Sequence, residues 1–175
     1  MNQKTFTKLT YGLYIISSKL GDKFNGQIAD CVMQITANPA TIAVSINKNN
    51  LTHEFIRTSK VFTVSILAKT TPFKFIGHFG FKSGRAIDKF NGINYQLGST
   101  GVPIVLDNTI GFLECELIQS VDVGTHTIFI GKVVAADLFN DAEPMTYDYY
   151  HTVLKGKTAK NAPTYIEEKG GKDDN

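Results

Sequence analysis

The sequence has no tryptophan, only two cysteines and no long apolar run. Two cysteines, Cys31 and Cys115, are too few for a disulfide framework, so we expect buried free thiols in a reducing compartment. No segment approaches the run of about 18 apolar residues that a membrane span needs. The polar first ten residues give no sign of a signal peptide, so a cytoplasmic location is expected.

An excess of charge of one sign and the common catalytic motifs are also missing. Lysine and arginine number 18 against 16 aspartates and glutamates, a net charge of +2 that is too balanced for a dedicated nucleic-acid binder. The four histidines are scattered, and none pairs with another histidine or a cysteine at metal-ligand spacing, so no metal site is expected. Walker, Gly-x-Ser-x-Gly and Gly-x-Gly-x-x-Gly motifs do not occur, so any cofactor must be held in another way.

What the sequence does contain is a series of strand-like segments. Alternating or apolar β-prone runs predict strands over residues 11–18, 27–36, 41–46, 61–67, 110–121 and 125–138, with a hairpin turn at 122–124. Helix signals are few and predict short helices over 51–59, from Pro72 to Gly77, and over 145–154. We therefore expect one mainly β domain, a closed or partly closed barrel over residues 1–166, followed by a charged flexible tail at 167–175.

Two segments combine cations with backbone donors at the ends of these elements. The first is the start of the helix at Leu51, where free N–H groups with Lys48, Asn50 and Thr52 suit a phosphate, although ordinary capping beside a solvated lysine explains the same residues. The second is the glycine-flanked loop 80–85, followed by Lys89, which suits close approach of an anion or is an ordinary loop.

Two further segments are less specific. His126 follows the hairpin turn at a strand end, where it reaches a cleft or serves as a structural hydrogen-bond donor. Residues 155–165 carry several cations and Tyr165 without helical or strand periodicity and, taken alone, form a loop. Together the four segments fit a flat, phosphorylated anion without identifying it.

In their order and spacing these segments resemble the flavin reductase-like family of FMN-binding split-barrel proteins, and within it the group of flavoredoxins, archaeal ferric reductases and high-molecular-weight rubredoxins. The resemblance runs from Gly12 to Tyr165 and rests on residues 25–29, Pro39, 47–52, 62–67, 83–90, 124–131 and 161–165. It implies a six-stranded antiparallel Greek-key barrel with short flanking helices, which forms homodimers with FMN close to the subunit interface.

The resemblance also implies roles for particular residues. The flavin ring would lie along the strand formed by Gln27, Ile28, Ala29, Asp30, Cys31 and Met33. The phosphate and ribityl chain would contact Asn47, Lys48, Asn50, Thr52, Ser83, Gly84 and Arg85. Lys89 would lie near the ring, and Tyr165 and the catalytic candidate His126 would line the open face where a nicotinamide stacks. Some relatives have a tryptophan near the position of Met33, so here that contact is absent or replaced by thioether packing.

Two functions remain open at this point. The first is an enzyme that passes hydride from NADH or NADPH to FMN and on to free flavin, ferric iron or a redox protein. The second is a flavoredoxin-like FMN carrier, reduced by another protein, that passes electrons to a rubredoxin-like partner; this partner is separate because the chain has no Cys-x-x-Cys pair. A small-ligand or single-strand nucleic-acid module is disfavoured by the near-neutral charge. Hydride transfer needs no general base, which agrees with the missing triad.

Overall fold

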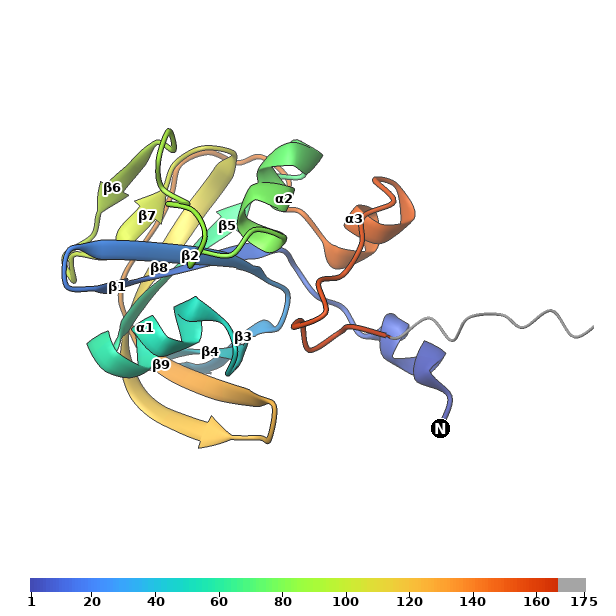
Figure 1. Ribbon diagram of the computed structural model, residues 1–175, viewed down its shortest axis with the longest axis horizontal. Coiled ribbons are helices and arrows are strands. Elements are labelled where there is room, and N and C mark those ends of the chain that lie inside the picture. Colours follow the sequence, from blue (N-terminus) through green and yellow to red (C-terminus); the bar gives the residue numbers. More distant parts are fainter. Residues whose placement is uncertain (167–175) are drawn as a thin grey trace, which may run out of the picture.

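The computed structural model describes residues 1–166, which form a curled antiparallel sheet flanked by short helices (Figure 1). The strands of the main sheet are β1 (Tyr14–Leu20), β2 (Lys23–Ala29), β3 (Val32–Ala37), β4 (Ala40–Asn47), β5 (Val61–Leu67), β8 (Thr109–Asp122) and β9 (His126–Leu138). A separate hairpin pairs β6 (Tyr95–Leu97) with β7 (Pro103–Val105). The helices are the 3-10 helix η1 (Gln3–Lys8), α1 (Leu51–Ser59), α2 (Phe73–Gly80) and α3 (Tyr147–Thr152).

The order of strands in the main sheet is β2-β1-β5-β8-β9-β4-β3. Its two edge strands, β2 and β3, are consecutive in the chain and are joined only by Asp30 and Cys31, so the sheet curls until its edges meet. This arrangement confirms the expected split barrel. The sheet has one strand more than expected because the segment 27–36, predicted as a single strand, breaks at Asp30.

The break has a local cause. The buried Asp30 accepts a hydrogen bond from the hydroxyl of Thr164, and its own carbonyl accepts from the N–H of Val32 at 3.1 Å, which turns the chain out of β2. The prediction that Cys31 lies within a strand is therefore wrong, and its thiol is only half-buried. Cys115 is buried in β8 as expected, and both cysteines are free.

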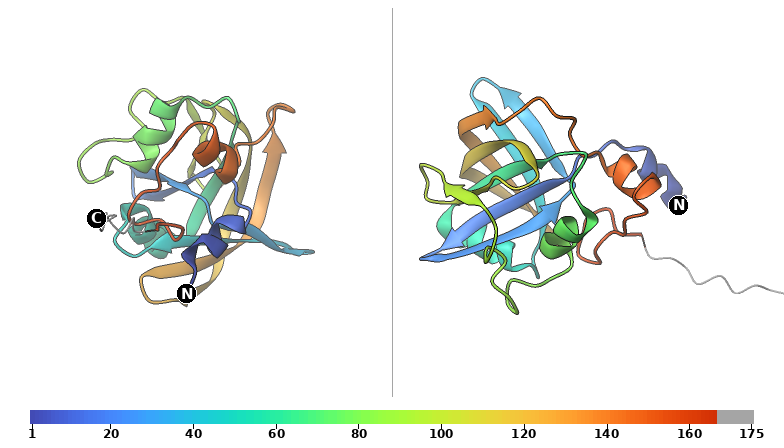
Figure 2. Two further views of the ribbon diagram at one scale, coloured as in Figure 1. Left: turned by 90° about the vertical axis from the view of Figure 1, so that its right-hand side faces the viewer. Right: turned by 90° about the horizontal axis from the view of Figure 1, so that it is seen from above.

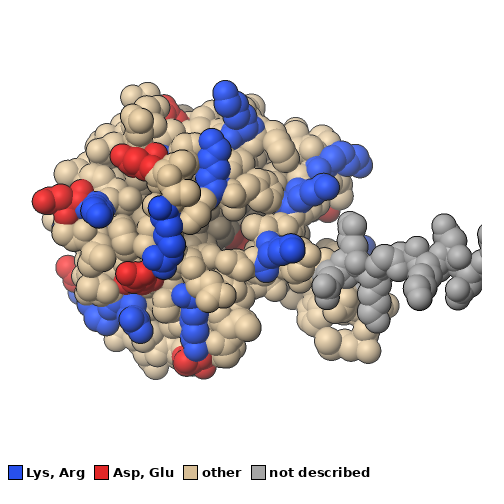
Figure 3. All heavy atoms as spheres, in the orientation of Figure 1, with Lys and Arg blue, Asp and Glu red and all other residues tan. Residues whose placement is uncertain are grey.

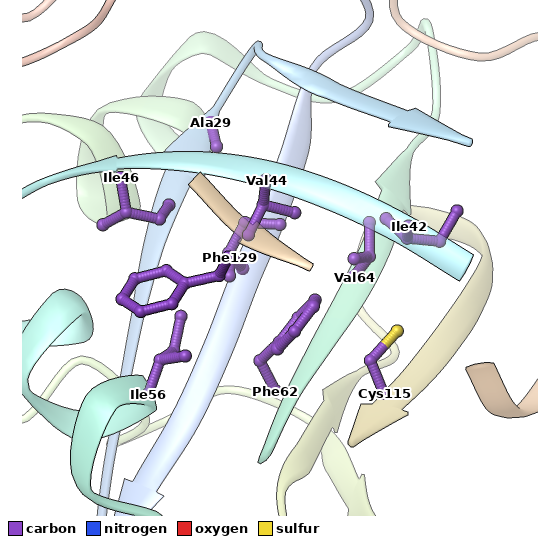
Figure 4. Close-up of a cluster of buried hydrophobic side chains, with 10 residues drawn as sticks. Ala29, Ile42, Val44, Ile46, Ile56, Phe62, Val64, Cys115 and Phe129 are labelled. Atoms are coloured by element: carbon purple, nitrogen blue, oxygen red, sulfur yellow. The ribbon is translucent and has the colours of Figure 1, made fainter. Parts of the chain in front are cut away.

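The sheet separates two hydrophobic clusters. The barrel interior holds Ile16, Ala29, Ile42, Val44, Ile46, Ile56, Phe62, Val64, Cys115 and Phe129, with Ile56 reaching in from α1 (Figure 4). The second cluster lies under α2 and α3 and contains Leu13, Ile15, Leu67, Ile76, Phe79, Phe90, Val105, Met145 and Tyr150. Because side chains alternate along a strand, β1 contributes Ile15 to one cluster and Ile16 to the other.

The helices are close to their predicted positions. The bounds of α1 match the prediction, and the helix ends where Lys60 adopts a left-handed φ of 64°. α2 continues beyond Gly77 to Gly80. α3 starts later than expected because Thr146 accepts from the N–H of Tyr149 and caps it there, and it ends at Thr152, two residues earlier than predicted. No pattern in the sequence predicted η1 or the β6–β7 hairpin.

The last described residues lie beside α3 and the N-terminal helix, at one side of the barrel (Figure 2). The predicted tail, 167–175, lies outside the described residues. Within residues 1–166 we find no helix with the length and apolarity that crossing a membrane requires.

Gly131 provides a test of how tightly the barrel is packed. A Cβ atom at this position would lie 2.7 Å from the ring of Phe62 and 2.8 Å from Cβ of Cys115. We expect Gly131→Ala to lower the free energy of unfolding by about 1–3 kcal/mol through overpacking, as measured by chemical denaturation. The control is Gly77→Ala in α2, where the nearest atom lies 3.7 Å away and helix propensity favours alanine. Equal stability of the two variants would contradict this account.

Candidate functional site

A cleft of about 550 Å³ opens beside the break between β2 and β3. Its floor is residues 25–30, which are the end of β2 and Asp30. One side is the start of α1, and another is the end of α2 with the loop 81–84. The remaining side consists of α3 and residues 157–165. We call residues 157–165 the C-terminal wall.

A buried lysine lies beneath the floor. The ammonium group of Lys89 donates to the carbonyl oxygens of Gly26 at 2.9 Å and Phe79 at 2.8 Å, and the residue is only 4% exposed. Burial lowers the pKa of Lys89 from its usual 10.5 to about 8. The two carbonyl oxygens therefore do not fully offset the loss of water around this cation.

Asn25 and Thr52 lie where the floor meets α1. Both are buried, and the Asn25 amide donates to the Thr52 hydroxyl at 2.8 Å. This leaves the Thr52 proton free to be donated, while the Asn25 Oδ1 has no hydrogen-bond partner within residues 1–166. A Cβ at Gly84 would overlap this oxygen, so the glycine keeps space open beside it. A buried acceptor without a partner favours a ligand that donates to it.

A second buried acceptor lies at the other end of the floor. One carboxylate oxygen of Asp30 accepts from Thr164 of the C-terminal wall, and the other has no hydrogen-bond partner in the described part of the chain. Asp30 also contributes, after desolvation, to raising the pKa of the neighbouring Cys31 thiol. Each end of the floor thus has a buried acceptor that no residue in 1–166 satisfies.

The start of α1 is open toward the cleft. Asn50 is the N-cap residue, but its side chain makes no capping bond. Its amide instead donates to Gln27 of the floor at 3.1 Å and accepts from Asn161 of the C-terminal wall at 2.9 Å. The N–H of His53 donates to the carbonyl of Asn50 at 3.0 Å, so within residues 1–166 it is the N–H groups of Leu51 and Thr52 that remain available to an anion.

Side-chain hydrogen bonds hold the C-terminal wall against the rest of the site. The hydroxyl of Tyr147 lies 2.8 Å from that of Thr158, and the hydroxyl of Tyr150 donates to the carbonyl of Lys157 at 3.1 Å. His126 contacts the carbonyl oxygen of Asn161 through Nε2 at 3.1 Å. The neighbouring helix α3 and the distant strand β9 therefore position residues 157–165 at one side of the cleft.

The structure brings together eleven of the sixteen residues that the sequence singled out. Those lining the cleft are Gln27, Ile28, Ala29, Asp30, Asn47, Asn50, Thr52, Ser83, Gly84, Lys89 and Tyr165. Cys31, Met33, Lys48, Arg85 and His126 do not line it.

The five predicted residues that do not line the cleft have other contacts or lie on the surface. Lys48 forms an ion pair with Asp122 at 2.5 Å and Arg85 one with Glu54 at 2.9 Å. Met33 is 63% exposed on β3. Cys31 borders a smaller cavity behind Tyr165, and His126 supports the C-terminal wall from outside.

Sequence reasoning missed a large part of the lining, namely Asn25, Ser45, Asn49, Tyr147, Tyr150, His151 and the wall residues 157–162. The clustered cations and absent periodicity of 155–165 were the available signal, but only the fold shows that this loop closes the cleft. No group of three or more histidine, cysteine, aspartate or glutamate side chains suited to a metal occurs in the described part.

Comparisons with known proteins agree with this architecture. The model of the family described as "Flavin reductase like domain" matches residues 6–156. A high molecular weight rubredoxin from Moorella thermoacetica is 57% identical over 94% of this chain and 72% of its own. A ferric-chelate reductase (NAD(P)H) from Archaeoglobus fulgidus is 44% identical over 97% of this chain and 100% of its own. The solved NADH:FAD oxidoreductase SgcE6 of Streptomyces globisporus has a similar fold, with a TM-score of 0.75, 23% identity, and coverage of 82% and 85%.

The buried ammonium of Lys89 predicts a pH dependence of stability. The pKa of Lys89 is about 8 in the folded protein and 10.5 in its usual, solvated state. Between these two pH values the unfolded chain binds more protons than the folded one, so the free energy of unfolding rises with pH. Relative to Lys89→Met, we expect the free energy of unfolding of the ligand-free protein to rise by about 2 kcal/mol between about pH 8 and pH 10. Urea denaturation across that range measures the difference, and a difference independent of pH would show that Lys89 titrates normally.

Proposed function

The chain belongs to the flavin reductase-like family, and from this premise we propose that its cleft binds FMN and that it transfers hydride from NADH or NADPH to that flavin. The electrons would pass on to free flavin, chelated ferric iron or a redox protein. The observation that carries the proposal is the floor of the cleft, where a buried ammonium group lies between two buried acceptors that have no partners within residues 1–166.

The residues present suit the parts of FMN. The floor is extended backbone, and Gly84 leaves room where a side chain would overlap Asn25. A flat ring can therefore lie along the floor, where Asp30 accepts from a ring N–H. The Oδ1 of Asn25 accepts from a hydroxyl of the ribityl chain. Both buried acceptors then have a partner.

The phosphate would be held where α1 begins. Thr52 donates its free hydroxyl proton, and the first N–H groups of α1 point to the same end of the cleft. Ser83 and the backbone at Gly84 approach from the opposite side. In this proposal Lys48 acts at a distance, since its ammonium is paired with Asp122.

FMN bound here supplies the redox chemistry, and the protein supplies position and electric field. The cation of Lys89 lies beneath the floor in a desolvated site, so it favours a ligand that gains negative charge on reduction. His126 acts in this proposal by holding Asn161 and thereby the C-terminal wall, beside the face that a nicotinamide would approach. No proton-transfer triad is required for hydride transfer.

A second candidate function is an electron carrier that receives electrons from a separate reductase and gives them to a rubredoxin-like partner. It is favoured by the 57% identity to a protein named a high molecular weight rubredoxin, 28% of which lies beyond the match. This chain has no Cys-x-x-Cys pair that could itself form such a centre. The partner would be a separate small redox protein.

We further propose that the chain forms a homodimer. β3 is an edge strand, and its exposed side chains include Met33 and Ile35. Exposed apolar residues recur on β8, including Ile118. Large exposed apolar side chains such as these are candidates for burial in an interface between two copies. Light scattering of the purified protein measures the oligomeric state, and a monomeric mass would contradict the proposal.

The visible spectrum of the protein tests the main proposal. We expect a flavin band that survives desalting after addition of FMN and that bleaches anaerobically with NADH, NADPH or both. A retained band that neither nucleotide bleaches would support the carrier. If no band is retained, turnover of NADH with excess FMN distinguishes a diffusible flavin substrate from a wrong assignment.

Replacing Thr52 and Lys48 separately tests the phosphate position. We expect Thr52→Ser to retain FMN and Thr52→Val to weaken its affinity about tenfold or more, because the donated hydrogen bond to a charged group is lost. Lys48→Met should change the affinity less, since its ammonium is held by Asp122. Flavin fluorescence titration measures each value, with circular dichroism as the check on folding. A larger effect from Lys48→Met than from Thr52→Val would contradict this position and indicate that the phosphate lies nearer the β8–β9 turn.

A further inference from the structure

Three exposed lysines lie around the mouth of the cleft. Lys82 lies on the loop after α2, and Lys157 and Lys160 lie on the C-terminal wall, so the three approach from two sides. All are exposed, and their ammonium groups form no ion pair or hydrogen bond with any residue in 1–166. Figure 3 shows basic side chains gathered around the middle of this face, with few acidic ones among them.

The charges at the cleft do not balance. Its lining contains four lysines, Lys89 and the three at the mouth, against a single carboxylate, Asp30. The neighbouring cations Lys48 and Arg85 are each neutralised by a carboxylate outside the lining. A flavin phosphate of charge about −2 at the start of α1 would compensate only part of this excess. The mouth is therefore left with positive charge for a second anion.

We propose that Lys82, Lys157 and Lys160 bind the phosphates of the incoming pyridine dinucleotide and make the site select the form that carries a 2′-phosphate, NADPH, over NADH. This inference rests on the proposed function and adds the choice of dinucleotide to it. Both dinucleotides carry a pyrophosphate, whereas only NADPH brings a further, dianionic group. A cluster of cations therefore favours NADPH by the interaction with that group.

Lysine suits this role at an exposed mouth. Its ammonium is a mobile point charge that binds phosphate without the fixed fork geometry of arginine. Because the three groups are exposed, salt screens their attraction, so the preference should fall as ionic strength rises. The additional phosphate also speeds the encounter of NADPH with a positive cleft.

The test uses the FMN-loaded full chain and the double variant Lys157→Gln/Lys160→Gln, with Lys82→Gln added in a triple variant. Lys23→Gln is the matched control, because Lys23 is an exposed lysine at the opposite end of β2 from the cleft. We expect the ratio of kcat/KM for NADPH to that for NADH to fall roughly five- to twentyfold in the double variant and further in the triple variant. The control ratio should not change.

A binding measurement separates recognition from catalysis. Adenosine 2′,5′-bisphosphate should bind the loaded protein more tightly than 5′-AMP, and this difference should shrink in the variants and at high salt, as measured by calorimetry. Equal affinity for the two probes, or an unchanged NADPH to NADH ratio in a protein that both nucleotides reduce, would overturn the inference while the proposed function stands. Loss of FMN affinity in the variants with an unchanged ratio would assign the lysines to the flavin phosphate instead. Reduction by neither nucleotide would overturn both proposals.

Discussion

The site depends on the way the two edges of the sheet are joined. β2 and β3 are neighbours in sequence but lie at opposite ends of the strand order, and only Asp30 and Cys31 connect them. A joint this short holds the end of β2 beside the start of β3 and so prevents the sheet from opening, although the two strands are not hydrogen-bonded neighbours in the sheet. The backbone at the end of β2 consequently faces a cleft instead of another strand.

An exposed sheet edge can pair with another strand. At the end of β2 this edge is instead covered by segments from elsewhere in the chain. The start of α1, the loop after α2 and the C-terminal wall each contribute one side. Asn50, at the start of α1, connects the floor of the cleft with the C-terminal wall, since its amide bonds to Gln27 and Asn161. The same contacts that shape the cleft therefore leave the N-terminus of α1 uncapped and ready for an anion.

Much of the fold follows from local pattern. Alternation in 61–67 and 41–46 and the Gly124 turn placed β5, β4 and the β8–β9 hairpin to within a few residues, and Leu51 and Ser59 bounded α1 as expected. The break at Asp30 escaped prediction because it depends on a hydrogen bond from Thr164, 134 residues away. Short-range patterns carry no information about such a contact.

The candidate site shows the same division. Residues on strands and at the start of α1, such as Gln27 and Thr52, were found because they belong to a recognisable order of motifs. Lys48 and Arg85 belong to that order too, yet the structure pairs them with Asp122 and Glu54. Asn25 and the C-terminal wall were missed because their importance lies in burial and in tertiary contacts, which a loop sequence does not reveal.

The C-terminal wall follows the last strand of the sheet in the chain, so the strands are synthesised before the cleft can be complete. All strands of the main sheet are complete by Leu138, whereas the wall begins at residue 157. During synthesis the barrel therefore has its full set of strands before the last side of the cleft has emerged. At that stage the cleft lacks one of its sides, so its floor and the start of α1 face solvent more openly. The binding site is therefore completed after the part of the fold that carries it.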